Sequence, residues 1–384
     1  MKDRVYFEGL DDEATICAYC GYCRSVCPTY AIVGWESCSP RGRIQLTRML
    51  LGKVRLSAGQ MSRLYQCTLC GRCNLVCSTR IDLRRFWLEA RDRTVARLLS
   101  PPGLFAARDN ISQTGNIYGY PNEERAGWVE YMDDAPPDLF RRDRADAVYF
   151  VGCSSSFSPR AQSIAESFAR LMSAAGVSFT IWGDDEVCCG FPLLVAGMRD
   201  QAEALIERNL ERFRATGATT AIFTCPSCRM MWLEKYAPRL PDVRMLHSTE
   251  LLDEAIAAGQ LRFRGLSRIV TYHDPCDLAR NGGVFDPPRR LLSMIPDLKL
   301  LETYERRERG LCCGGGGDLE IVDPKLVESV AAETAKKLAA IGAEAIVTAC
   351  PQCLRTLIKG VETSALKVDV LDIVELLASV LDNQ

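Results

Sequence analysis

The sequence is poor in histidine, in excess basic charge and in long apolar runs. Two His residues among 384 cannot build the usual histidine-rich zinc sites, and they exclude a pair of bis-histidine haems. Lys and Arg total 47 against 49 Asp and Glu, so no positive surplus neutralises phosphates, and no nucleic-acid partner is expected. No run approaches the ~18 apolar residues of a membrane span, and the N-terminus lacks the apolar core of a signal peptide. We therefore expect a cytoplasmic chain that reaches a membrane only through a partner.

Cysteine, in contrast, is abundant, with 19 copies. An odd total argues against a closed disulfide framework, and in a reducing compartment clustered cysteines usually bind metal or carry redox chemistry. Nine cysteines lie in residues 17–77 and ten in residues 153–353, with none in residues 78–152. Metal held by thiolates is therefore the first hypothesis.

The first cysteine zone contains one spacing twice. Cys-x-x-Cys-x-x-Cys-x-x-x-Cys is followed by Pro28 in the first copy and by Ser78 in the second. This is the spacing of bacterial ferredoxins with two cubane 4Fe–4S clusters, in which the fourth cysteine of each motif binds the other cluster. Zinc and free thiols are the alternatives, but zinc favours cysteine pairs separated by a longer loop. The predicted cubane ligands are Cys17, Cys20, Cys23 and Cys77 for one cluster, and Cys67, Cys70, Cys73 and Cys27 for the other.

The second zone also contains a repeat: a single cysteine, a Cys-Cys-Gly triplet and a Cys-x-x-Cys pair. The intervals are 35, 37 and 3 residues in the first copy and 36, 38 and 3 in the second. Such regular spacing indicates a duplicated unit and a pseudo-two-fold arrangement. The cysteines are Cys153, Cys188, Cys189, Cys225 and Cys228 in the first copy, and Cys276, Cys312, Cys313, Cys350 and Cys353 in the second.

Each copy alternates short apolar runs with stretches of helical periodicity, which predicts a parallel sheet covered by helices. The cysteines then follow the carboxyl ends of strands, where such sheets bind ligands. Upstream, residues 81–99 are predicted to be an amphipathic helix and residues 101–137 a long irregular connector. The predicted strands are 146–152, 178–182, 221–224, 269–272, 298–301 and 345–348, and the predicted helices are 159–175, 199–216 and 324–341.

These motifs resemble the paired cysteine-rich CCG domains of the heterodisulfide reductase family. The segments are VGCSSS, EVCCGFP, TCPSC, YHDPCDLAR, LCCGGGG and ACPQC. The ferredoxin motifs followed by Ser39-Pro40-Arg41-Gly42-Arg43 are similar to that family's fused catalytic subunit. They are also similar to the related iron–sulfur subunits of glycolate and glycerol-3-phosphate dehydrogenases. The resemblance implies an α+β multidomain chain, whose predicted parts are a helical two-cluster ferredoxin-like domain (1–100), a connector (101–145) and duplicated α/β CCG domains (146–252 and 268–384).

In heterodisulfide reductases, the CCG cysteines bind non-cubane 4Fe–4S clusters with five thiolates each. Both five-cysteine sets are complete here, so the resemblance implies two non-cubane clusters beside the two cubanes, with all ten cysteines at catalytic sites. One ordinary cubane or zinc per set is the alternative. Cys38 is left over and is interpreted as a small buried side chain. Gly314–Gly317 lacks the ending of a phosphate loop and is expected to make room for a substrate.

Two histidines and two arginines have several interpretations. His273, three residues before Cys276, is a donor to cluster sulfur, a proton donor to a departing thiolate, or a structural histidine. His247 has no motif around it and is interpreted as structural. Arg41 and Arg43 either bind an anion or are solvated.

Two functions remain open. In the first, the chain reduces or forms a small-molecule disulfide at the non-cubane clusters, and electrons arrive one at a time through the cubanes. In the second, it is an electron-transfer subunit of a flavin-dependent 2-hydroxyacid or glycerol-3-phosphate dehydrogenase and passes electrons towards quinone. The completeness of both five-cysteine sets favours the first. Either function requires a flavoprotein or cytochrome partner.

Overall fold

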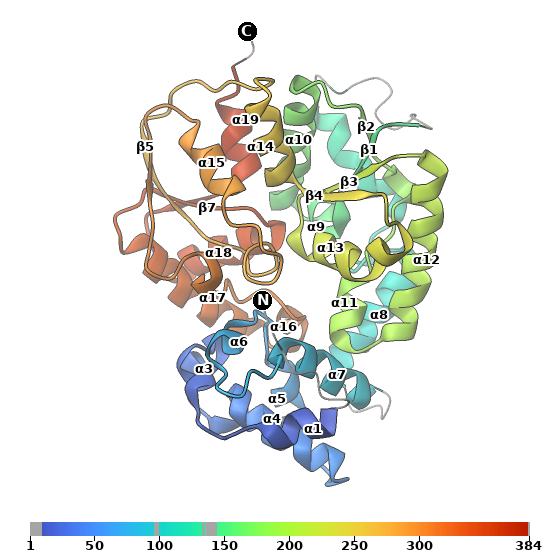
Figure 1. The fold of residues 1–384 in the computed structure, drawn as a ribbon, viewed down its shortest axis with the longest axis vertical. Coiled ribbons are helices and arrows are strands. Elements are labelled where there is room, and N and C mark those ends of the chain that lie inside the picture. Colours follow the sequence, from blue (N-terminus) through green and yellow to red (C-terminus); the bar gives the residue numbers. More distant parts are fainter. Residues whose placement is uncertain (1–9, 96–99, 133–134, 136–143, 383–384) are drawn as a thin grey trace.

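The computed structural model describes residues 10–95, 100–132, 135 and 144–382. Figure 1 shows three parts: a helical part in blue at the bottom, and two α/β units above it, one green to yellow and one orange to red. In these described ranges, no helix is both long and apolar enough to cross a bilayer.

The blue part, called here the ferredoxin part, packs short helices around a small core. Phe86 and Trp87 are fully buried, and their rings pack edge to face with centroids 4.9 Å apart. Most of the cysteines of the first zone pack against this core. The last helix confirms the predicted one as far as residue 95, and residues 96–99 lie outside the described residues. The elements are α1 (Leu10–Ile16), α2 (Tyr22–Ser25), α3 (Pro28–Val33), η1 (Glu36–Cys38), α4 (Pro40–Leu51), α5 (Ala58–Tyr65), α6 (Arg72–Val76) and α7 (Leu83–Val95).

The segment expected to be an irregular connector is largely helical, so that expectation was wrong. It forms α8 (Pro102–Thr114) and the 3₁₀ helix η2 (Asn122–Tyr131). Proline at the first turn of α8 costs no hydrogen bond, and Leu104 and Ile111 are buried against the first α/β unit. Trp128 of η2 is also fully buried. Pro102 lies in the first turn of α8, Gly115 follows its last residue, and Pro121 directly precedes η2.

The first α/β unit is a four-stranded parallel sheet in the order β2-β1-β3-β4. Helix α10 presents Ile164, Phe168 and Leu171 to the core at helical spacing, and all three are fully buried. The elements are β1 (Ala147–Phe150), α9 (Gly152–Phe157), α10 (Pro159–Ala174), β2 (Phe179–Thr180), η3 (Gly183–Asp185), α11 (Phe191–Ala196), α12 (Arg199–Thr216), β3 (Thr220–Phe223), α13 (Pro226–Met231), η4 (Trp232–Tyr236), η5 (Ala237–Arg239), β4 (Arg244–His247) and α14 (Ser248–Ala257).

The second unit repeats this topology, with the parallel order β6-β5-β7-β8. The strands and helices predicted in both copies are present, and the fourth strand of each sheet was not predicted. The elements are β5 (Arg268–Tyr272), α15 (Pro287–Ser293), β6 (Leu298–Leu301), η6 (Arg307–Arg309), α16 (Leu319–Val322), α17 (Pro324–Ala339), β7 (Ala345–Thr348), α18 (Pro351–Thr363), β8 (Asp369–Asp372) and α19 (Ile373–Ser379).

The two units pack against each other with pseudo-two-fold symmetry. Helices α10 and α15 follow the first strand of their sheets, and α14 and α19 follow the last. Helix α10 packs on α19, and α14 packs on α15, so the two contacts are equivalent. One continuous core joins both units through these helices. The duplication inferred from cysteine spacing is therefore also present in the packing.

Candidate functional site

The two Cys-x-x-Cys-x-x-Cys loops share one backbone conformation. The residue before the middle cysteine is left-handed in both, with φ of 54° at Tyr19 and 53° at Leu69. The glycine after that cysteine is left-handed too, with φ of 83° at Gly21 and 75° at Gly71. Alternation of this kind turns successive backbone N–H groups towards a common centre, which suits an anionic group. Glycine is the residue that adopts such a φ without strain.

Cysteines of the two motifs come together in the crossed arrangement that the spacing predicts. Cys67, Cys70, Cys73 and Cys27 line one small buried cavity of about 20 Å³. We call these four the second ferredoxin group. The fourth residue of this group comes from the first motif, as predicted.

The remaining four form the first ferredoxin group, defined as Cys17, Cys20, Cys23 and Cys77. Burial, together with the nearby sulfurs of the other three, raises the pKa of Cys23 to about 11. The hydroxyl of Ser78 lies 3.2 Å from the Cys20 sulfur and lowers the pKa of that exposed thiol. Ser78 stands where proline is usual in this motif, and its hydroxyl contacts the opposite motif, a role that the sequence did not suggest.

Arg43 is buried beside the second ferredoxin group, so the solvated interpretation was wrong for this residue. Its guanidinium donates to Thr29 Oγ1 at 2.9 Å and to the Arg63 carbonyl at 2.8 Å, and it reaches the Cys27 sulfur at 4.0 Å. Arg41 is different, because it pairs with Glu36 at 2.7 Å near the surface. The buried guanidinium of Arg43, 4.0 Å from the Cys27 sulfur, stabilises negative charge on that thiolate.

The first CCG group, defined as Cys153, Cys188, Cys189, Cys225 and Cys228, surrounds a larger cavity of about 460 Å³. Cys153 follows β1, the Cys188–Cys189 pair follows β2, and Cys225 caps α13 after β3. All five cysteines line the cavity, as the predicted strand ends require. The opposite wall comes from the second unit and includes Gly315–Gly317, Asp318 and Arg355.

The sulfurs of this group touch one another. The thiols of Cys188 and Cys228 hydrogen-bond to Cys189 and lower the pKa of Cys189 to about 6. The interaction with Cys188, together with burial, raises the pKa of Cys153. Thiols in such contact form a site in which thiolate is present at neutral pH.

A buried ion pair supports the first cysteine of this group. Arg125 Nη1 lies 2.8 Å from Glu186 Oε1, and both side chains are almost fully buried. Glu186 accepts from the backbone N–H groups of Val151 and Gly152 at 2.9 and 2.8 Å, and Arg125 Nη2 lies 3.7 Å from the Cys153 sulfur. Burial raises the pKa of Glu186 although Arg125 lowers it. Arg125 belongs to η2, so the connector contributes directly to this site.

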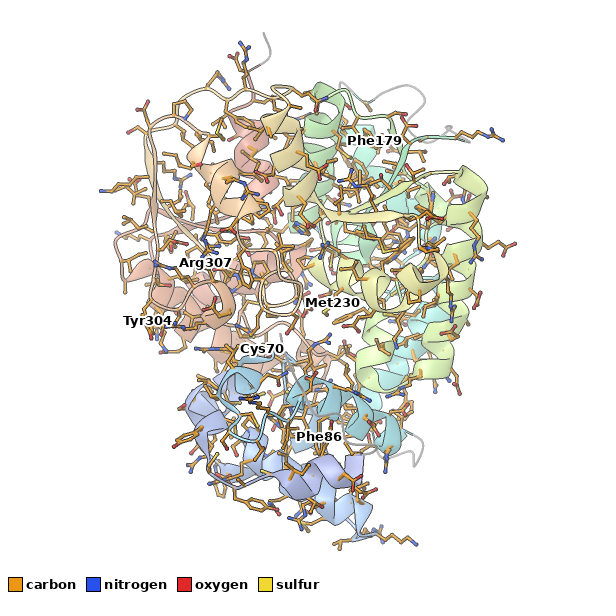
Figure 2. All side chains as sticks on the ribbon, in the orientation of Figure 1. Cys70, Phe86, Phe179, Met230, Tyr304 and Arg307 are labelled. Atoms are coloured by element: carbon orange, nitrogen blue, oxygen red, sulfur yellow. The ribbon has the colours of Figure 1, made fainter. Side chains whose placement is uncertain are left out.

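The second CCG group, defined as Cys276, Cys312, Cys313, Cys350 and Cys353, lies next to the ferredoxin part. Cys313 and Cys353 sulfurs are 3.2 Å apart. Cys312 interacts with Cys276 of its own group and also with Cys70 of the second ferredoxin group, and this contact raises the pKa of Cys70. Figure 2 shows Cys70 at the top of the blue part, directly below the α/β units. The second CCG group and the second ferredoxin group are therefore in contact.

The backbone around this contact is closely packed. Arg280 Nε donates to the Cys70 carbonyl at 2.7 Å, and its Nη1 donates to the carbonyls of Glu308 and Gly310 at 2.7 and 3.1 Å. A Cβ on Gly316 would lie 2.6 Å from the Thr68 carbonyl oxygen. Only glycine allows this approach. Gly315–Gly317 line the cavity, and Gly316 also lets the second unit pack closely against the ferredoxin part.

A hydrogen bond across the interface of the units links the loops that carry the two CCG groups. Ser227, between Cys225 and Cys228, donates to Asp277 at 2.7 Å, and Asp277 follows Cys276 directly. The second group also has a buried ion pair: Arg289 donates to both oxygens of Asp274 at 2.9 Å.

The carboxylate positions of these ion pairs differ between the copies. Glu186 lies two residues before its Cys-Cys pair, where the second copy has Gly310. A Cβ on Gly310 would lie 3.0 Å from Asp274 Cβ. Each unit therefore places one buried carboxyl in this region, from a different strand end.

Neither histidine reaches a cysteine through a ring nitrogen. His273 Nδ1 is 3.1 Å from Thr348 Oγ1 and Nε2 is 3.2 Å from the Leu311 carbonyl, and burial lowers the pKa of His273 to about 4. This geometry favours the structural interpretation. His247 caps α14 and lies 3.2 Å from the Thr224 carbonyl. Cys38 is buried and contacts Arg63 and Gln66 at 3.1 and 3.2 Å, apart from the four groups.

Several residues at the site were not predicted from the sequence. Arg125, Arg280 and Asp318 lie outside the Cys-x-x-Cys and Cys-Cys-Gly patterns, and their roles come from tertiary contacts.

The donor chemistry of the four groups fits iron–sulfur clusters. The second ferredoxin group and the first CCG group offer four and five thiol sulfurs around one cavity each, with cations beside Cys27 and Cys153 to offset thiolate charge. Over the described part of the chain, no three His, Cys, Asp or Glu side chains are arranged to hold a single metal ion.

Comparison with known proteins agrees with the motifs. The family model described as 4Fe-4S dicluster domain matches residues 13–81, and the model described as cysteine-rich domain, CCG, matches residues 147–232 and 270–358. A solved structure, a hypothetical protein from Helicobacter pylori, has a TM-score of 0.56 and 8% identity over 90% of this chain and 68% of that one. This last likeness concerns the fold alone.

Curated relatives include proteins whose names describe an activity, among them the following two. The first is a subunit of the dihydromethanophenazine:CoB–CoM heterodisulfide reductase of Methanosarcina acetivorans, which is 33% identical over 396 residues, covering 96% of this chain and 94% of that protein. The second is the EtfAB:quinone oxidoreductase of Syntrophomonas wolfei, which is 29% identical over 328 residues, covering 82% of this chain and 46% of that protein. The chain is an iron–sulfur oxidoreductase subunit that binds 4Fe–4S clusters, and it belongs to the heterodisulfide reductase family.

Proposed function

We propose that the chain reduces, or in the reverse direction forms, an organic disulfide in the 460 Å³ cavity. The observation that carries this proposal is the cavity itself, which is lined by all five cysteines of the first CCG group and faces the glycine loop of the second unit. Its volume is in the range of small-molecule sites. The name of the M. acetivorans relative, part of a heterodisulfide reductase, supports a disulfide as the substrate class.

We assign two cubane 4Fe–4S clusters to the ferredoxin groups and two non-cubane clusters to the CCG groups. When bound, such clusters carry electrons one at a time. The contact of Cys70 with Cys312 supports passage between the ferredoxin part and the second unit, and the Ser227–Asp277 hydrogen bond links the two CCG groups. The order of the groups is first ferredoxin, second ferredoxin, second CCG, first CCG.

A separate redox partner belongs to this function. Cys20 of the first ferredoxin group is exposed, so this group is accessible from outside. We assign the partner to the flavoproteins or cytochromes, and any membrane link to that partner. Both named relatives belong, by their names, to redox systems with other components.

Metal analysis tests the cluster assignment. The anaerobically purified chain is expected to hold about 16 irons and as many sulfides, from four clusters of four. Cys70→Ala should lose about four irons, and Cys38→Ala is the matched control because Cys38 is also buried in the ferredoxin part but lies outside the groups. A total near eight irons would leave only the cubanes and refute the CCG assignment.

Turnover tests the disulfide assignment. Reduced viologen should be oxidised by an organic disulfide in the presence of the chain, and Cys189→Ser or Cys313→Ser should abolish this while the cubane signals persist. Persistence is expected because the ferredoxin groups share no cysteine with the CCG groups. Cys38→Ser should retain the rate. Retained disulfide reduction in both CCG variants would exclude the proposal.

The second candidate is an electron relay of a flavin-dependent dehydrogenase towards quinone. The likeness to EtfAB:quinone oxidoreductase and the continuous contact of cysteine groups favour it. In that case the wild-type chain would not consume a disulfide, and its clusters would be reduced by the dehydrogenase partner and reoxidised through a quinone-reducing one.

A further inference from the structure

One carboxyl on the cavity wall has its oxygen atoms free of protein donors. Asp318 follows the glycine run and precedes α16, with a left-handed backbone at φ of 57°. It lines the cavity and is the N-cap residue of α16, but its side chain makes no capping hydrogen bond, and its carboxyl oxygens accept none from a donor in the described ranges. Glu320 of the same cavity differs, because Gln352 and Arg355 donate to it at 3.0 and 3.2 Å. Asp318 is thus available to a molecule in the cavity.

The surroundings of the Asp318 carboxyl keep its pKa near neutral pH. Burial raises the pKa of Asp318 to about 7, although Arg91 lowers it. Arg91 does not pair with the carboxylate directly, because its guanidinium donates to four backbone carbonyls, those of Tyr65, Cys67, Val195 and Gly317. A carboxyl that exchanges its proton near the working pH is suited to general acid–base catalysis.

The proposed reaction requires such a group. Cleavage of RS–SR′ consumes two electrons and two protons and releases RSH and R′SH. The electrons come from the one-electron redox partner, through the ferredoxin groups. When the S–S bond breaks, a departing sulfur carries negative charge inside the cavity, and a proton donor next to it removes that charge.

A phenol of the cavity and a nearby histidine do not meet this need. Burial raises the pKa of the Tyr118 phenol. His273 does not line the cavity, and its two nitrogens contact Thr348 and Leu311. This excludes the histidine as the direct donor in the cavity.

We propose that Asp318 is the catalytic acid that protonates the departing thiolate when a disulfide is cleaved in the cavity, and the base that accepts the thiol proton in the reverse reaction. This role rests on the proposed function. The O–H bond of Asp318 breaks as the new S–H bond forms, and solvent protons restore the acid. Asp318→Asn is a well-matched variant, because asparagine tolerates the left-handed backbone and has nearly the same shape.

Infrared spectroscopy tests the acid without turnover. The oxidised holoprotein should show a protonated-carboxyl band that disappears as the pH rises through about 7, the value set by burial against Arg91. Asp318→Asn should remove this band, and Glu320→Gln, a matched change in the same cavity, should leave it. A band that survives in Asp318→Asn would overturn the assignment.

The pH dependence of disulfide reduction is the second test. Because the protonated acid acts in this direction, the wild-type rate should fall as the pH rises through the pKa of Asp318. Asp318→Asn should lower the rate roughly 10²- to 10⁴-fold and remove this limb, with unchanged iron content. The other titratable and charged groups that face Asp318 or share its cavity are Arg91, Tyr65, Tyr118, Glu320, Arg355 and the five cysteines of the first CCG group.

Different results would refute the proposed function and the role of Asp318. A wild-type chain that cleaves no disulfide refutes the proposed function, and with it this role for Asp318. A wild-type chain that cleaves disulfide, together with an Asp318→Asn variant of equal rate and equal pH profile, refutes the acid alone.

Discussion

The buried ion pairs next to the CCG groups cost folding free energy, and other interactions at the site offset this cost. Moving a charge out of water costs several kcal/mol for each ion, and the attraction within the pair only roughly offsets this desolvation cost. Arg125 and Glu186 offset this cost with additional hydrogen bonds from Val151 and Gly152 to the carboxylate. The Arg125 guanidinium 3.7 Å from Cys153 then also stabilises thiolate sulfur. The pair therefore supports both the strand end and the charge of the site.

Arg125→Met should lower the free energy of unfolding by about 3–5 kcal/mol, because it leaves a buried carboxylate without its cation. The double variant Arg125→Met, Glu186→Gln should recover part of this loss, since it removes the unpaired charge and the amide oxygen still accepts from one of the two backbone N–H groups. Arg108→Met is the control, because its partner Asp109 is exposed and such pairs contribute at most about 1 kcal/mol. Anaerobic urea unfolding of the holoprotein measures all three. A single variant no less stable than the double one would contradict this account.

At the scale of elements, sequence patterns predicted those strands and helices that short-range signals determine. Strands such as β7 (Ala345–Thr348) and helices such as α12 (Arg199–Thr216) were predicted to the residue, because uniform apolar runs and helical periodicity are local signals. The fourth strands, β4 and β8, alternate buried and less buried residues and were missed. Each precedes a helix with a capping box, formed by His247 with Glu250 and by Asp372 with Glu375. That pattern was readable and would have located both strands.

In the candidate site, too, some features follow from local sequence patterns and others from long-range packing. Cysteine spacing within the two ferredoxin motifs predicted which of their cysteines lie together, including the crossed exchange of Cys27 and Cys77, because spacing in a loop is a local property. The two CCG sets came from the family resemblance. Long-range packing placed Arg125 beside Cys153 and Arg280 beside Cys70, and no local pattern encodes those contacts. The same holds for Asp318, whose significance depends on the opposite wall of the cavity.

The glycine run shows how one element serves two neighbours. Gly316→Ala would place a Cβ 2.6 Å from the Thr68 carbonyl oxygen, which forces the ferredoxin loop and the glycine loop apart. We expect a loss of about 1–3 kcal/mol in unfolding free energy, the usual cost of overpacking, together with partial loss of iron from the second ferredoxin group. Gly59→Ala in α5 is the control, because a Cβ there meets no atom within 4 Å. Urea midpoints and iron content distinguish the two variants, and equal values for both would count against the packing argument.

At the scale of the whole molecule, the three parts meet at one buried guanidinium. Arg91 of α7 donates to Tyr65 and Cys67 in the ferredoxin part, to Val195 in the first unit and to Gly317 in the second, at 2.9–3.2 Å. Its ring contact with Tyr65, 4.9 Å from the centroid, fixes its plane. The parts are therefore joined at a point close to the second ferredoxin group.

Arg91→Met should uncouple the parts. The variant leaves four buried carbonyls without their donor, and an unsatisfied buried polar group costs about 1–3 kcal/mol. Because these carbonyls belong to all three parts, the loss acts on their docking more than on any single fold. Hydrogen exchange should become faster along residues 65–69 and 195–198 than within β1 or β7, where the sheet bonds are intact. Arg239→Met, which removes a surface cation paired with Glu203 and Glu207, is the control and should change neither region. Exchange that rises uniformly, or not at all, would show that the parts are held together by their apolar contacts instead.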